Sequence, residues 1–257
     1  MLAGMEEIRR DFLIPELQAA MIEGGITGVI TVQARQSLAE TEWLLQLAES
    51  HDFMLGIVGW APLIDQNIGN YLEMYAPRKK LIAVRHVLHD EADDFYMLRE
   101  DFNRGIALLK DFDLRYDILI FERHLPQTIE FVDGHPNQIF VVDHIAKPRI
   151  KTGELSPWKE LLAELAKREN VYCKLSGLVT EADWHAWTAP QLRPYIDTVL
   201  ECFGPKRVMF GSDWPVQLVA SDYPRWIQVV SEAVETLSDS EKAQIFAGTA
   251  RAAYGLI

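Results

Sequence analysis

Residues 138–144 read QIFVVDH, a run that is apolar on both faces and ends abruptly in an aspartate and a histidine. A strand without polar alternation is typical of a parallel sheet that is covered on both sides. Six other runs have the same character, namely 28–33 (GVITVQ), 54–60 (MLGIVGW), 81–88 (LIAVRHVL), 116–121 (YDILIF), 171–176 (VYCKLS) and 207–213 (RVMFGSD). The sequence therefore predicts seven buried parallel strands.

Segments with helical spacing separate these strands. Pro15 and the pair Gly24-Gly25 bracket a first helix, and Ser37 with Glu40 forms a capping box before a second one. Further helices are predicted at 102–109, from Pro126, from Ser156-Pro157 to Arg168, at 223–237 and after Ser238.

Strands that alternate with helices form either a doubly wound sheet or a closed barrel. Seven such units in 257 residues favour the barrel, and no glycine-rich phosphate turn follows the first strand. We predict a single α/β domain over 1–257, a (β/α)8 TIM barrel whose first strand is missing from the chain. The gap should leave strand 28–33 as an exposed edge or as one covered by another element or chain.

The composition excludes several classes of function. The chain has 25 Lys and Arg against 38 Asp and Glu, a net charge of −13, which disfavours binding to nucleic acid or to an anionic membrane. Its apolar runs are too short to span a bilayer, and its start has no signal-peptide core, so a cytoplasmic location is expected. Cys173 and Cys202 are expected to be reduced and packed as small apolar residues.

Polar side chains gather where four of the strands end: Arg85 and His86; Asp143, His144 and Lys147; Lys174 and Ser176; Ser212 and Asp213. The carboxyl ends of barrel strands meet at one mouth, where barrel enzymes place their catalytic groups. Such a cluster of charges is costly unless the charges pair or take part in chemistry. We therefore expect an active site there.

The segments VRHVLHDE (84–91), VVDHIAKP (141–148), CKLSGL (173–178) and MFGSDWPV (209–216) together resemble the amidohydrolase superfamily. The closest resemblance is to its sugar-lactone hydrolases, of the L-fuconolactonase and L-rhamnonolactonase type, which are related to 2-pyrone-4,6-dicarboxylate lactonase. The resemblance implies a lactone hydrolase in which Asp213 is the catalytic carboxylate and His144 the histidine of the sixth barrel strand. It places Trp60, Arg85, His86 and Lys174 against the substrate, and we add Lys147 from its place in the mouth.

The chain departs from that family at its start. Family members open with a His-x-His strand about twenty residues before the segment that matches RRDFLIPELQ (9–18), and no His-x-His occurs here. We expect either that the natural reading frame begins upstream of Met1 or that the chain is a truncated paralogue. His144 and Asp213 would be the metal ligands if a metal is bound. Because two ligands hold zinc weakly, we predict no tightly bound metal here and leave a divalent ion such as zinc open for a longer protein.

The chemistry of a lactone suits these residues. Asp213 would take a proton from water, and His144, His86 or Arg85 would polarise the carbonyl. Each residue also has a purely structural alternative: a helix cap for Asp213, a histidine bonded to backbone for His144, salt bridges to the acidic loop 90–94 for Arg85 and His86, and a solvated Lys147. The other histidines, at 51, 89, 124, 135 and 185, are expected at the surface.

Three other functions stay open. The first is a metal-dependent amidohydrolase or decarboxylase of the same fold. The second is a Schiff-base aldolase that uses Lys174 or Lys147. The third is an inactive barrel that binds a small acid. A homodimer is compatible with the sequence but is not specified by it.

Overall fold

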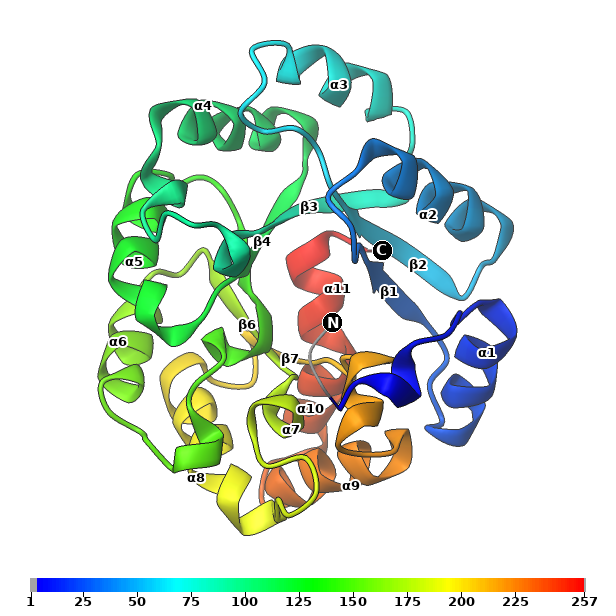
Figure 1. Cartoon of the computed structure of the whole chain (residues 1–257), viewed down its shortest axis with the longest axis vertical. Coiled ribbons are helices and arrows are strands. Elements are labelled where there is room, and N and C mark those ends of the chain that lie inside the picture. Colours follow the sequence, from blue (N-terminus) through cyan, green and yellow to red (C-terminus); the bar gives the residue numbers. More distant parts are fainter. Residues whose placement is uncertain (1–3, 257) are drawn as a thin grey trace.

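A computed structural model of the chain describes residues 4–256. Its strands are β1 (Val29–Val32), β2 (Met54–Gly59), β3 (Leu81–Val87), β4 (Arg115–Leu119), β5 (Phe140–Val142), β6 (Val171–Leu175) and β7 (Val208–Phe210). All neighbouring strands are parallel, and their order in the sheet is their order in the chain. The sheet curls around a central axis with most of the helices outside it (Figure 1). The predicted TIM-barrel fold is confirmed, and residues 4–256 supply the seven predicted strands.

The helices are α1 (Ile14–Glu23), α2 (Leu38–Ser50), α3 (Ile68–Tyr75), α4 (Glu100–Leu109), α5 (Leu125–Asp133), α6 (Trp158–Leu165), α7 (Leu178–Glu181), α8 (Ala189–Phe203), α9 (Tyr223–Ala233), α10 (Asp239–Ala243) and α11 (Thr249–Tyr254). Ser37 and Ser238 accept hydrogen bonds from the backbone N–H groups of Glu40 and Glu241. The capping box is complete at Ser238, but the predicted box at Ser37 is not, because the Glu40 carboxylate accepts from the N–H groups of Ala34 and Arg35. None of the helices in this part of the chain is long and apolar enough to cross a membrane.

Several elements are shorter than the sequence predicts. β5 ends at Val142 and β7 at Phe210, because the backbone of His144 and Asp213 turns to positive φ, which a strand does not accommodate. α6 ends at Leu165 instead of Arg168, whose guanidinium donates to the carbonyl oxygen of Glu164 and closes the last turn. α9 likewise ends at Ala233, four residues before the predicted end.

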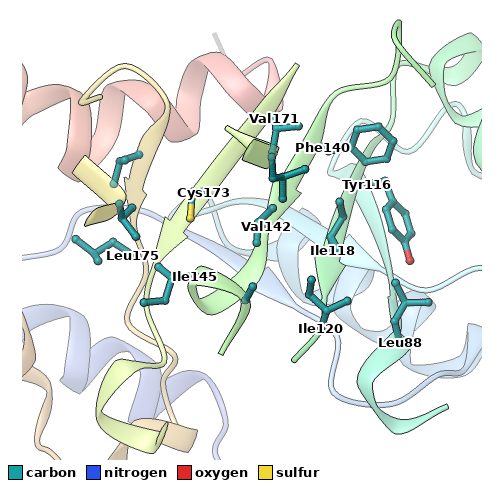
Figure 2. Packing of buried hydrophobic residues seen from close by; sticks show 14 of the residues in the cluster. Leu88, Tyr116, Ile118, Ile120, Phe140, Val142, Ile145, Val171, Cys173 and Leu175 are labelled. Atoms are coloured by element: carbon teal, nitrogen blue, oxygen red, sulfur yellow. The ribbon is translucent and has the colours of Figure 1, made fainter. Parts of the chain in front are cut away.

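The main hydrophobic core lies between the sheet and its outer helices. Every second residue of the strands points outward into it, for example Ile118, Val142 and Cys173 (Figure 2). Cys173 is fully buried and Cys202 half-buried, and neither forms a disulfide, as expected. The alternate strand residues point to the barrel axis, so this core holds the strands that carry the polar residues in place.

A second, smaller core lies inside the barrel, and α11 fills it. Ala253 and Tyr254 at the end of α11 pack against inward residues of the strands, including Val58, Ala83, Val141 and Met209. The helix lies within the ring of strands (Figure 1). Apolar side chains therefore close the lower part of the barrel, below the polar residues at the strand ends.

The expected gap in the barrel lies between β1 and β7. Within residues 4–256 no strand pairs with their outer edges. β1 is half-buried along its length, and Ile30 and Val32 pack against the inner core that contains Tyr254. The outer edge of β1 therefore has no strand partner, but the inward side chains of β1 are covered by α11.

Candidate active site

Asp213 and His144 meet at the mouth of the barrel. Oδ1 of Asp213 lies 3.7 Å from Nε2 of His144, and the side chains are 14% and 12% exposed. Asp213 follows β7 and His144 follows β5, so two segments about seventy residues apart share one site. The 3₁₀-helix that follows Asp213, Val216–Val219, has no side-chain cap, which excludes the capping role for this aspartate.

The loop that carries His144 has an unusual backbone. His144, Ile145, Ala146 and Lys147 have φ of 52°, 49°, 61° and 47°, so four consecutive non-glycine residues are left-handed. Each costs about 1–2 kcal/mol relative to the right-handed form. Burial of Ile145 and Ala146, together with a 2.7 Å hydrogen bond from Nε1 of Trp158 to the Ile145 carbonyl, opposes this cost. Strain held in place at a strand end is typical of a functional site.

Ser176 fixes the ring of His144. Its Oγ lies 2.8 Å from Nδ1 of the imidazole, while Nε2 faces Asp213. The ring also packs against Gly177, where no side chain would fit. His144 is therefore held by contacts to the turn that follows β6, and its alternative role as a histidine bonded only to backbone is excluded.

Burial controls the charge of both residues. It lowers the pKa of His144 to about 3, an effect that Asp143 opposes, so the imidazole is neutral near pH 7. Burial raises the pKa of Asp213 to about 7, with Lys147 and Arg85 acting in the opposite direction. Asp213 can therefore accept a proton and return it near neutral pH, as a general base must.

Lys147 lies at the rim of the same site. Its Nζ is 3.6 Å from Oε1 of Glu181 and 5.4 Å from the centre of the Phe121 ring. Burial raises the pKa of Glu181, and Lys147 opposes this effect. Because the ammonium group is paired and largely buried, the alternative of a solvated Lys147 is wrong.

Arg85 and Lys174 point inward, but buried carboxylates already engage them. Nη1 of Arg85 lies 2.8 Å from Oδ2 of Asp143. Nζ of Lys174 lies 2.5 Å from Oδ2 of Asp117 and 2.7 Å from Oδ1 of Asp143. Arg85 thus pairs with a strand-end aspartate and not with the acidic loop.

His86 and Trp60 form another linked pair. Nε1 of Trp60 donates to Nδ1 of His86 at 3.4 Å, and Nε2 of His86 lies 2.6 Å from Oε1 of Glu91. The imidazole also stacks on Tyr96 with 5.0 Å between ring centres. Burial lowers the pKa of His86, although Glu91 opposes the effect. Both ring nitrogens are occupied, so His86 is poorly placed to polarise a carbonyl.

Two of the histidines expected at the surface are not there. His124 is 1% exposed, with Nε2 2.9 Å from Oδ1 of Asp94, and His89 packs against the ring of Phe121. Burial lowers the pKa of His89 to about 4, and Lys147 adds to the effect. The loops after β3 and β4 fold over the mouth and bury both rings.

Sequence reasoning missed Glu181 and Asp117 and did not assign Ser176 a role. Asp117 had a signal, since it is the charged residue in the apolar run YDILIF. Ser176 was visible only as a polar residue at a strand end. Glu181 lies in α7, where nothing in the sequence distinguishes it from a solvated helix residue.

His144 and Asp213 are the candidate metal ligands. Across residues 4–256 no group of three or more His, Cys, Asp or Glu side chains is arranged to hold a metal ion. A catalytic zinc usually has three protein ligands and an open position. The residues described here therefore do not complete such a site.

The chain is similar to known proteins over nearly its whole length. The chain is 38% identical to an L-fucono-1,5-lactonase of Burkholderia multivorans over 99% of this chain and 89% of the relative, and 32% identical to one of Burkholderia ambifaria over 96% and 86%. A solved amidohydrolase structure from Burkholderia multivorans with bound zinc superposes with a TM-score of 0.96 at 38% identity, covering 100% of this chain and 93% of the other. A family described as amidohydrolase matches residues 3–256. The chain belongs to the amidohydrolase family.

Proposed function

We propose that the protein hydrolyses the lactone of a sugar acid by attack of a water molecule that Asp213 deprotonates. The observation that carries the proposal is the pair of a proton-accepting carboxylate and a neutral imidazole, Asp213 and His144, at the barrel mouth. The lactonase names of two relatives that match most of the chain support the choice of substrate.

In this mechanism the attacking water donates a hydrogen bond to Oδ1 of Asp213, and Nε2 of His144 faces the lactone carbonyl oxygen. Oδ1 and Nε2 are 3.7 Å apart, too far for a direct hydrogen bond, so each atom is free for its own role. Asp213 takes a proton as the water oxygen attacks the lactone carbonyl carbon. The ring C–O bond then breaks, and the ring oxygen leaves as a hydroxyl after it receives the proton from Asp213.

His144 stabilises the negative charge that develops on the carbonyl oxygen. A neutral imidazole carries one N–H. When the hydroxyl of Ser176 donates to Nδ1, that N–H is at Nε2 and faces the reacting atoms. A fixed donor in a buried site stabilises an oxyanion more than the same donor in water.

The charges favour an uncharged, hydroxyl-rich substrate. The three cations at the mouth, Arg85, Lys147 and Lys174, each contact a carboxylate. An anionic substrate would have to compete with those carboxylates. The Schiff-base alternative is disfavoured for Lys174: burial acts to lower its pKa, but Asp117 and Asp143 outweigh this and raise it, so the amine stays protonated.

The test is hydrolysis of purified aldonolactones, such as L-fucono- and L-rhamnonolactone, followed by proton release in weakly buffered indicator. Asp213→Asn should lower kcat at least about 1000-fold and His144→Gln about 100-fold, as expected for loss of a base and of an oxyanion donor. Asp52→Asn and His185→Gln, at exposed positions, are the controls. Turnover by Asp213→Asn at the wild-type rate, or no turnover of any lactone by the wild type, would contradict the proposal.

A further inference from the structure

A buried chain of contacts runs from the C-terminal helix to the barrel mouth. The hydroxyl of Tyr254 donates to the carboxylate of Asp117, with its oxygen 2.8 Å from Oδ2 and 3.0 Å from Oδ1. Asp117 contacts Lys174, which also contacts Asp143. Asp143 holds Arg85 and directly precedes His144. The chain thus joins α11 to strands β3, β4 and β6 and to the loop after β5.

Tyr254 is held in place by the barrel itself. Nε of Arg115, on β4, donates to the carbonyl oxygen of Ala253 at 2.8 Å. Gly255 ends the helix at φ 66°, and a Cβ there would lie 2.7 Å from Nη2 of Arg115. Tyr254 is 2% exposed and packs in the inner core. Its ring is therefore held in the inner core, at the end of α11, the helix that lies within the ring of strands (Figure 1).

We propose that Tyr254 is a positioning residue for the active site, whose hydroxyl keeps Asp117 ionised and so keeps Lys174 and Asp143 aligned beneath His144. The charges support this role. Two carboxylates, Asp117 and Asp143, which are 0% and 1% exposed, balance two cations, Arg85 and Lys174, which are 11% and 12% exposed. If Asp117 became protonated, Lys174 would lose one of its two anionic partners and the cluster would carry a net positive charge.

The carboxylate of Asp117 is close to becoming protonated at neutral pH. Burial raises its pKa to about 6 and Asp143 acts in the same direction, whereas the charge of Lys174 and hydrogen bonds from Lys174 and Tyr254 oppose the effect. A hydrogen bond to a carboxylate is typically worth about one to two pKa units. Without the hydroxyl, Asp117 should therefore be largely protonated at pH 7 and ionised again near pH 9.

The inference rests on the proposed function for its kinetic test, which compares Tyr254→Phe with the wild type from pH 6 to 9. At pH 7 we expect kcat to fall about tenfold, in line with a pKa rise of one unit or more, with KM within twofold because Tyr254 does not reach the substrate. The deficit should shrink toward pH 9. Tyr195→Phe is the control, because it removes another buried hydroxyl, one that donates to the Glu154 carbonyl and not to Asp117. A deficit that does not vary with pH indicates a merely structural role and would overturn the inference.

A second measurement does not need turnover. The carboxyl carbon of Asp117 can be titrated by 13C NMR in the wild type and in Tyr254→Phe, with Asp117→Asn used for its assignment. We expect the apparent pKa of Asp117 to rise by about one unit or more in the variant. An unchanged value contradicts the inference even in an active enzyme. An inactive wild type with a raised pKa in the variant contradicts only the proposed function.

Discussion

Gly177 lies directly against the imidazole of His144. A Cβ at position 177 would be 2.7 Å from Cβ, Cγ and Nδ1 of that histidine, and the backbone of Gly177 is left-handed at φ 70°. No other residue type leaves the ring where it is. The glycine at 177 therefore sets the distance between His144 and Asp213 as much as any polar contact does.

Gly177→Ala should displace the His144 ring and lower kcat at least about tenfold, because a shift of about 1 Å in a catalytic group costs that much or more. The control is Gly153→Ala, which has the same left-handed backbone (φ 73°) but open space around the new Cβ. Backbone strain should cost both variants about 1 kcal/mol of unfolding free energy, measured in urea, and the clash with His144 should add to the loss in Gly177→Ala. Equal activity of the two variants would show that the contact with His144 does not matter.

The value of kcat/KM should increase with pH, with the midpoint of the increase near pH 7. Asp213 acts as a base only when ionised, and burial raises its pKa to about 7, so kcat/KM should fall about tenfold per pH unit below pH 6. A pH–rate profile from pH 5 to 9, on a lactone that is stable over this range, measures this acid limb, the part of the profile in which the rate rises with pH. A flat profile between pH 5 and 8 would exclude Asp213 as the base.

Lys147→Gln should move the acid limb of the kcat/KM profile to higher pH. The lysine favours the ionised form of Asp213 and lowers its pKa, so its removal lets the pKa of the carboxyl rise further. The matched control is Lys151→Gln, because Lys151 also pairs with a carboxylate, Asp183, but is 66% exposed. A limb at the same pH in all three proteins would show that Lys147 does not act on Asp213.

Lys174→Met should destabilise the fold by about 3–5 kcal/mol, because it leaves Asp117 and Asp143 buried without their shared cation. Lys206→Met, at an exposed position, should change the unfolding free energy by less than about 0.5 kcal/mol. Chemical denaturation at pH 8 measures both. Wild-type stability of Lys174→Met would mean that the ion pairs contribute nothing.

The fold was largely predictable because hydrophobic patterning alone separates strands from helices. Runs such as QIFVVDH have no polar face, which is typical of a parallel sheet that is covered on both sides. The same logic placed Asp213 and His144 at one mouth, since the carboxyl ends of parallel strands share an edge. Their juxtaposition at 3.7 Å bears this out.

The partners of the site residues were not predictable, because they depend on which inward side chains face each other across the barrel. The sequence presents Arg85 and Lys174 as free to bind substrate. In the structure Asp143 contacts both cations, and Asp117 contacts Lys174. Tyr254 lies in a helix whose sequence, TARAAY, has nothing to mark it as entering the barrel. The left-handed turn at 144–147 had no signal either, because it contains no glycine.

The left-handed turn at 144–147 lowers the stability of the fold while it positions His144 for catalysis. Ala146 is buried at φ 61°, so Ala146→Gly would relieve strain there without removing a large side chain. A screen for heat resistance should therefore recover this substitution, and the variant should unfold at a higher temperature but position His144 less sharply. Selection for stability would therefore favour glycine at position 146, whereas selection for catalytic rate would favour alanine there.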